Sequence, residues 1–344
     1  MDTETLKNRI REVKRQYGPD LVILGHHYQT DDILEMTDIQ GDSLELARRI
    51  PGLNARRIVF CGVDFMAESA SILATPAQKI YIPDVTASCV MADMAPAPLV
   101  EAVTHRLDQT GGSVIPLAYV NSSAAVKALC GQMGGSVCTS ANAATMLSWA
   151  LDQGDRVLFL PDKNLALNTA HSIGLPRSQC MVLDVRGRGN RLDTGRTKGK
   201  KLLMWPGVCA IHFKFKSEQI RSIRERHPEA RIVVHPECSP ELVQAADASG
   251  STSFIIDYVE NAPLGQTIFI GTEVHLVKRL RKQYSGKKEI LPIADIACSN
   301  MAKISLEKLA HLLEGLEDQE PVTVPGDIGK PALLSLERML RVCS

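Results

Sequence analysis

The 344-residue sequence lacks several features that would place it in a special class of protein. No apolar run approaches the roughly 18 residues needed to span a bilayer, and the charged residues 1–18 lack the apolar core of a signal peptide. Neither sign of charge is in excess, with 39 Lys and Arg against 39 Asp and Glu. We therefore expect a cytoplasmic protein with no membrane partner, and we do not expect nucleic acid as a ligand.

Paired cysteine motifs are also missing. The chain has nine cysteines, but no two stand in a C-x-x-C pair, which argues against a zinc ribbon or a thioredoxin-type redox site. An odd number in a long chain without a signal peptide argues against a disulfide framework. Small buried hydrophobic side chains are the default explanation for cysteines, and it accounts for Cys61, Cys130 and Cys180.

Short strands rich in Val, Ile and Leu alternate with helix-length segments, and the pattern occurs three times. The repeats open near Leu21, Val114 and Leu202, roughly ninety residues apart. Fully apolar strands between helices are typical of parallel sheets that are covered on both faces. The predicted fold class is α/β, with three pseudo-threefold-related α/β/α domains, each built on a small parallel sheet, around a central cavity.

The expected boundaries follow the repeat. Unit one covers residues 1–88, and residues 299–344 form C-terminal helices that pack back on it. Unit two covers residues 89–175 and unit three covers residues 202–298. Residues 176–201 form a basic, mostly irregular insertion, which we interpret as a solvated loop; a contact with phosphate, a partner enzyme or nucleic acid is the alternative.

Polar residues follow the predicted strands in all three units. Ligands of parallel sheets bind beyond the carboxyl ends of the strands, so these residues are expected to face one cavity. Hydroxyl groups near helix N-termini suit anionic ligands, although plain helix capping would also explain Ser43, Ser140 and Thr252. The residues at these positions are His26, His27 and Tyr28; Gly41, Asp42 and Ser43; Tyr119, Val120 and Asn121; Thr139 and Ser140; His212; His235, Pro236 and Glu237; and Ser251 and Thr252.

Three cysteines lie in predicted loops near the same places. Cys89 follows the last strand of unit one, Cys209 follows the strand that opens unit three, and Cys298 precedes a helix. Three thiolates without a fourth ligand would leave one iron of a cubane cluster open to a substrate oxygen. Spacing alone does not select these three from the nine.

Motifs along nearly the whole chain resemble those of the quinolinate synthase (NadA) family, in the same order. They are LGHHYQ, GDSLELAR, SCVMADM, YVNSSAAVKA, CTSANA, FLPDKNLA, WPGVCAIH, VVHPEC, GSTS, IGTEVHLVKRL and CSNMAKI. The resemblance implies condensation of iminoaspartate with dihydroxyacetone phosphate to quinolinate, with loss of phosphate and two waters. It also suggests a functional link to an aspartate oxidase, which would supply iminoaspartate.

The resemblance further implies a [4Fe–4S] cluster held by Cys89, Cys209 and Cys298. Its implied substrate contacts are His26, Ser43, Tyr119, Asn121, Ser140, His235, Glu237 and Thr252. Tyr28 and His212 occupy motif positions that resemble active-site groups.

Among these residues, Glu237 is the best general acid or base, with Tyr28 or Tyr119 as a second proton carrier. The open iron would act as a Lewis acid. The competing hypothesis is a non-enzymatic three-domain protein that binds dicarboxylates or sugar phosphates and keeps the cysteines as inert core residues. Asp162 and Lys163 are interpreted as turn residues.

Overall fold

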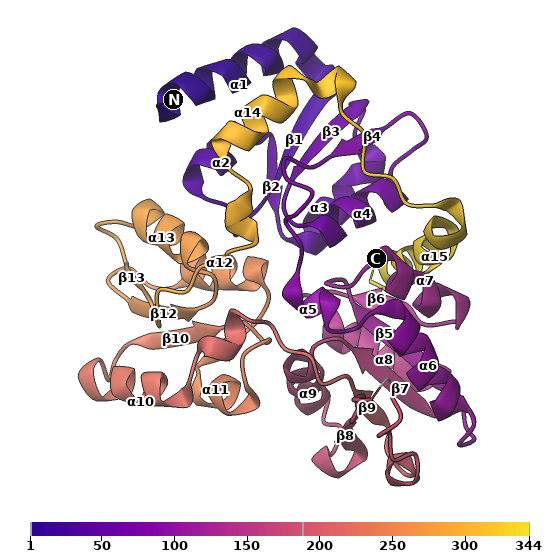
Figure 1. Ribbon diagram of the computed structural model, residues 1–344. Helices are drawn as coiled ribbons and strands as arrows, with labels where there is room; N and C mark the ends of the chain where they lie inside the picture. The colour runs from indigo at the N-terminus through magenta and orange to yellow at the C-terminus, as the bar shows by residue number, and fades with distance from the viewer. Residues whose placement is uncertain (1, 188, 344) are drawn as a thin grey trace.

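Three α/β units lie at the corners of a triangle in the computed structural model, which describes residues 2–187 and 189–343 (Figure 1). Each unit contains one parallel sheet flanked by helices, with four, five and four strands respectively. This confirms the predicted fold class. Within the described part of the chain, no helix combines the length and the apolar character needed to cross a membrane.

Unit one has the strand order β2-β1-β3-β4, with all pairs parallel. Its central strands carry fully buried side chains such as Ile23 and Val59, because helices cover both faces of the sheet. The strands are β1 (Leu21–His26), β2 (Ile39–Gly41), β3 (Arg57–Cys61) and β4 (Lys79–Tyr81). The helices are α1 (Thr3–Tyr17), α2 (Asp31–Met36), α3 (Ser43–Arg49) and α4 (Asp64–Leu73), with the short turns η1 (Gly18–Asp20) and η2 (Ile50–Gly52).

Unit two has the order β6-β5-β7-β9-β8. Its strands are β5 (Val114–Tyr119), β6 (Ser136–Cys138), β7 (Arg156–Leu160), β8 (Cys180–Val182) and β9 (Leu202–Met204). Its helices are α6 (Ala97–Asp108), α7 (Ala124–Gln132), α8 (Ala143–Gln153) and α9 (Lys163–Ser172).

Unit three has the order β11-β10-β12-β13, which matches that of unit one. Its strands are β10 (Arg231–Val234), β11 (Ala248–Ser249), β12 (Thr267–Gly271) and β13 (Glu289–Pro292). Its helices are α10 (Ser217–Arg226), α11 (Pro240–Ala245), α12 (Thr252–Asn261) and α13 (Val274–Gln283).

The expectation that the strand at Leu202 opens unit three is wrong. This strand, β9, pairs with β7 and β8 inside the sheet of unit two, where Leu158 lies opposite Leu203. It therefore corresponds to β4 and β13, the fourth strands of the other units. The insertion 176–201 is also less irregular than expected, since it contains β8 and the turns η3 (Arg177–Gln179) and η4 (Gly195–Thr197). A short apolar run is buried equally well in any parallel sheet, so its pattern does not identify its sheet.

The C-terminal helices pack on two units, whereas the sequence predicted one. Helix α14 (Leu306–Glu314) runs beside α1, and Arg9 pairs with Glu314. After the turn η7 (Leu316–Asp318), helix α15 (Gly326–Val342) packs mainly against α7 and β6 of unit two. A Cβ at Gly131 of α7 would lie 1.9 Å from the Pro331 carbonyl oxygen, so glycine is required for this close approach.

Candidate active site

The three units meet around a cavity of about 120 Å³. Residues from the carboxyl ends of strands in all three sheets line it, as expected for parallel sheets. Every residue proposed from the sequence as a cluster ligand, substrate contact or active-site group lines this cavity: His26, Tyr28, Ser43, Cys89, Tyr119, Asn121, Ser140, Cys209, His212, His235, Glu237, Thr252 and Cys298. Their individual roles remain predictions.

Each unit contributes one cysteine to the cavity from an equivalent position. Cys89 follows β4, Cys209 follows β9 and Cys298 follows β13, and each lies just before a short helical turn. Since β9 belongs to unit two, Cys209 follows the strand that lies beside β7 in that unit and not the first strand of unit three. The turns are α5 (Val90–Asp93), η5 (His212–Lys214) and η6 (Met301–Lys303).

The same backbone hydrogen bond holds each cysteine loop. The first residue of the helix after the third strand donates its N–H to the carbonyl two positions before the cysteine. The three bonds are Asp64 N to Ala87 O at 2.8 Å, Lys163 N to Gly207 O at 3.0 Å, and Val274 N to Ile296 O at 3.0 Å. The close approach in unit two also needs a glycine, because a Cβ at Gly207 would lie 2.5 Å from the Pro161 carbonyl oxygen.

The chemistry of the three cysteines suits metal ligation. Burial raises the pKa of Cys89 to about 12 and also raises the pKa values of Cys209 and Cys298. A thiolate at these positions therefore needs a cationic partner, and a metal that binds there must displace the protons. The cavity also holds a buried polar atom without a partner among the described residues, the Asn121 Oδ1 atom. Both observations fit a site built for a metal group and a polar ligand.

Ser43, Ser140 and Thr252 follow the second strand of their units, and none of them is a helix N-cap. The N-caps of α3, α8 and α12 are the neighbouring residues Asp42, Asn142 and Ser251. Capping therefore does not explain the three hydroxyl groups. The Thr252 hydroxyl donates instead to the Tyr28 hydroxyl oxygen at 3.1 Å.

His26 is the last residue of β1 and His235 directly follows β10, so both lie at the carboxyl ends of corresponding strands. In each imidazole, Nδ1 accepts the backbone N–H two residues ahead, from Tyr28 at 3.1 Å and from Glu237 at 3.3 Å. Burial lowers the pKa of both histidines to about 3, so both are neutral near pH 7 and carry their proton on Nε2. They can donate hydrogen bonds to a ligand without adding a positive charge.

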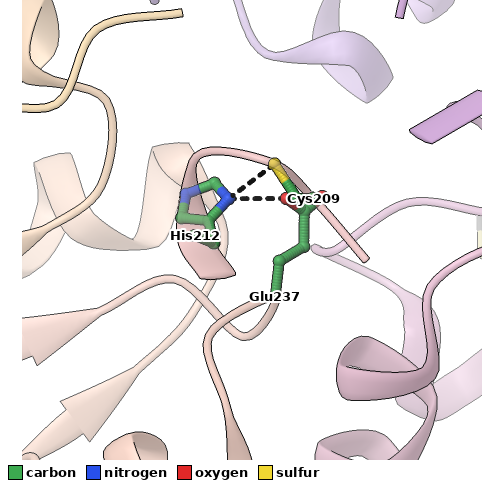
Figure 2. A group of neighbouring side chains, drawn as sticks. All are labelled: Cys209, His212 and Glu237. Atoms are coloured by element: carbon green, nitrogen blue, oxygen red, sulfur yellow. Dashed lines mark hydrogen bonds and ion pairs between the residues drawn. The ribbon is translucent and has the colours of Figure 1, made fainter. Parts of the chain in front are cut away.

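His212 lies between an acid and a hydroxyl group. Its Nδ1 is 2.6 Å from Glu237 Oε2 and 3.3 Å from Cys209 Sγ, as Figure 2 shows. Its Nε2 is 3.1 Å from Thr272 Oγ1, and that oxygen is 2.7 Å from the Tyr28 hydroxyl. The ligand atoms of Cys209, His212 and Glu237 lie within 4.8 Å of one another, but both ring nitrogens of His212 already have partners.

One set of proton positions gives every hydrogen bond in this series of side chains a donor and an acceptor. An ionised Glu237 only accepts, so His212 carries its proton on Nδ1 and accepts the Thr272 hydroxyl on Nε2. Thr272 then accepts from Tyr28, and Tyr28 accepts from Thr252. Burial opposes the charge of Glu237, but its interaction with His212, including the hydrogen bond from Nδ1, outweighs burial and holds the pKa of this carboxyl below its ordinary range. Burial raises the pKa values of the Tyr28 and Tyr119 hydroxyls, which keeps both protonated.

Among these hydrogen-bonded side chains, Thr272 is the one that was not predicted from the sequence to lie at the site. It is fully buried directly after β12. Threonine is common at strand ends and rarely signals a site by itself. The only available signal was its position after an apolar strand, where the other site residues also lie. An acid, an imidazole and a hydroxyl in this order can move a proton to or from the hydroxyl.

Known proteins resemble the chain along nearly its whole length. Residues 8–341 match the family model described as "NadA: Quinolinate synthetase A protein". The quinolinate synthase of Bacillus anthracis (strain A0248) is 42% identical over 99% of this chain and 94% of its own length. Those of Bacillus cereus (strain AH187) and Bacillus thuringiensis subsp. konkukian (strain 97-27) match over the same shares with the same identity.

Proposed function

This chain belongs to the quinolinate synthase family, and we propose that its cavity condenses iminoaspartate with dihydroxyacetone phosphate to quinolinate, releasing phosphate and two waters. It is accordingly an enzyme of NAD biosynthesis. The observation that carries the proposal is the convergence of three equivalent cysteines and the Glu237–His212–Thr272 chain on one cavity. A binding protein without activity would have no use for such a chain, which makes that alternative the weaker one.

We propose that Cys89, Cys209 and Cys298 hold a [4Fe–4S] cluster. When bound, the cluster supplies a Lewis-acidic iron to which a substrate oxygen can coordinate. Support comes from the donor set: each unit gives one thiol, and no fourth cysteine lines the cavity within residues 2–187 and 189–343. An incomplete set of protein ligands is what a site open to substrate requires.

The two substrates carry two carboxylates and one phosphate, and the cavity offers matching donors. The Nε2–H groups of His26 and His235 can each bind an anionic oxygen, and the hydroxyls of Ser43 and Ser140 add two further donors. The unpaired Asn121 Oδ1 can accept an N–H or O–H of a substrate.

We assign proton transfer to four hydrogen-bonded side chains, those of Glu237, His212, Thr272 and Tyr28. Glu237 holds the proton of His212 on Nδ1, which leaves Nε2 free to take the proton of Thr272. Thr272 can in turn receive a proton from Tyr28, whose hydroxyl lines the cavity. Proton abstraction beside a carbonyl, ring closure and two dehydrations all need a group that gives and takes protons at one place. We assign Tyr28 to this role, with Tyr119 beside Glu237 as a second carrier.

We further propose a functional link to an aspartate oxidase as the source of iminoaspartate, and a cytoplasmic location. The decisive experiment on the main proposal uses protein purified and reconstituted with iron and sulfide without oxygen. We expect about four irons per chain, broad absorption near 400 nm as is typical of cubane clusters, and formation of quinolinate from the two substrates. A colourless protein that takes up no iron and forms no quinolinate would refute the proposal.

A further inference from the structure

The residue that caps the helix after the third strand differs among the three units. These N-caps are Val63 for α4, Asp162 for α9 and Glu273 for α13. Each stands two positions after the end of its strand, so the three are structurally equivalent. Units two and three therefore carry a carboxylate where unit one carries an apolar side chain.

Asp162 uses its two oxygens for two different purposes. Oδ1 accepts the backbone N–H groups of Asn164 at 2.7 Å and Leu165 at 2.9 Å, which caps α9. Oδ2 accepts the backbone N–H of Cys209 at 3.1 Å. One side chain thus ties the helix to the cysteine loop.

Glu273 repeats this arrangement in unit three. Oε2 accepts the backbone N–H of His275 at 2.7 Å and caps α13. Oε1 accepts the backbone N–H of Cys298 at 3.2 Å and also contacts Nδ1 of His275 at 2.8 Å.

Both carboxylates are costly to bury, since Asp162 is 0% exposed and Glu273 is 1% exposed. A serine or threonine would cap the helices at a smaller desolvation cost. Serine and threonine have only one side-chain oxygen, so neither could cap the helix and also accept the cysteine N–H. In unit one the contacts that supplement the shared backbone bond of the Cys89 loop come from lysines: Lys303 Nζ donates to Thr86 O at 2.5 Å, and Lys308 pairs with Asp84.

We propose that Asp162 and Glu273 are positioning residues that fix the Cys209 and Cys298 loops for cluster binding. The inference rests on the proposed function, because it assumes that these cysteines are cluster ligands. A partner that orients a metal ligand typically changes metal affinity by about 10- to 100-fold when it is lost. The two loops are then held ready for the metal, while the Cys89 loop has no such carboxylate.

Asp162→Asn tests the proposal with little effect on the helix. The amide oxygen can replace Oδ1 and keep the cap, while the amide nitrogen then faces the Cys209 N–H and cannot accept it. Turning the amide over would set its nitrogen against two N–H groups, so the cap orientation is preferred. Glu273→Gln leaves one amide oxygen for two backbone donors, the His275 N–H and the Cys298 N–H, so it breaks the tie between the helix and the Cys298 loop whichever way the amide lies.

Two control variants separate the cysteine contact from general stability. His275→Gln removes the contact between the imidazole and Glu273 but leaves the Cys298 bond. Asp247→Asn alters another carboxylate of unit three, whose Oδ2 accepts the Ile232 N–H at 2.7 Å away from the cavity. The measurements are thermal unfolding of the iron-free proteins, iron per chain after anaerobic reconstitution, and the rate of iron loss to a chelator.

We expect Asp162→Asn and Glu273→Gln to stay folded without iron, with a lower midpoint of thermal unfolding because one buried N–H loses its acceptor, yet to lose iron about 10- to 100-fold faster. The two controls should lose iron at the wild-type rate. If the wild type holds a cluster and both carboxylate variants hold it equally well, the inference is overturned while the proposed function stands. If the wild type takes up no iron, both are overturned.

Discussion

Nδ1 of His212 lies 2.6 Å from Oε2 of Glu237, although the two residues belong to different units. His212 follows β9, the last strand of unit two, and Glu237 follows β10, the first strand of unit three. The contact therefore exists only when these units are docked on each other. Both side chains are buried, so solvent does not weaken the pair.

Replacing Glu237 by glutamine should stop turnover while the cluster remains. The amide cannot take a proton and cannot hold the His212 proton as a carboxylate does. We expect quinolinate formation to fall by about 10²- to 10⁴-fold, the usual contribution of a general acid or base. Absorption near 400 nm and iron content should match the wild type. A variant with normal turnover would remove Glu237 from the mechanism.

Thr272→Val should impair both stability and activity, whereas Thr272→Ser should preserve most of each. Valine has nearly the same shape, but it leaves His212 Nε2 without a donor and the Tyr28 O–H without its acceptor. Each unpaired buried group costs about 1–3 kcal/mol in the free energy of unfolding. Turnover should fall because no proton can pass between His212 and Tyr28. Equal rates for the valine and serine variants would contradict the relay.

Cys89→Ala, Cys209→Ala and Cys298→Ala should each abolish retention of the cluster. Cys61→Ala and Cys130→Ala are the matched controls, since both thiols are fully buried and lie away from the cavity lining. The controls should lose some stability through the space that the sulfur leaves, but they should keep a full complement of iron. The measurement is iron content after anaerobic reconstitution. A cysteine whose alanine variant keeps a complete cluster would not be a cluster ligand.

Stability of the iron-free protein should fall as the pH drops from about 6.5 to about 3. Folded His26 and His235 have pKa values of about 3, against an ordinary value of 6.5. Over this range the unfolded chain binds protons that the folded chain does not, so acid favours unfolding. Above pH 6.5 both states are neutral at these sites and the effect disappears. Each histidine contributes up to about 1.4 kcal/mol per pH unit.

His26→Asn tests this pH dependence, because the asparagine oxygen can still accept the Tyr28 N–H. Denaturant unfolding at several pH values should give a shallower loss of stability for the variant, by up to about 1.4 kcal/mol per pH unit. An unchanged slope would show that His26 titrates normally in the folded protein.

The apolar strands were sufficient to predict three parallel sheets, because burial on both faces leaves a strong pattern in the sequence. The location of the polar residues after the strands could also be predicted, because a parallel topology gathers the carboxyl ends of the strands at one edge. The sheet to which β9 belongs could not be predicted from the sequence. Leu202, Leu203 and Met204 would be buried in either unit, and only the pairing with β7 decides.

Two side chains at the site could not be interpreted from sequence for a different reason. Thr272 and Asp162 act through hydrogen bonds to partners distant along the sequence: Thr272 bonds His212 and Tyr28, and Asp162 bonds the Cys209 N–H. Neither bond leaves a periodic trace in the sequence. Asp162 resembles an ordinary turn residue, and it does cap a helix, so its second contact became visible only in three dimensions.

The equal distribution of the cysteines has a consequence for biogenesis. Each unit supplies one thiol, so neither a single unit nor a docked pair presents the complete set. An unfinished or misassembled chain would offer iron no more than two ligands. Only a molecule whose three units have reached their final positions would therefore take up the metal group. Loading of the cofactor would then distinguish correctly assembled molecules from the rest.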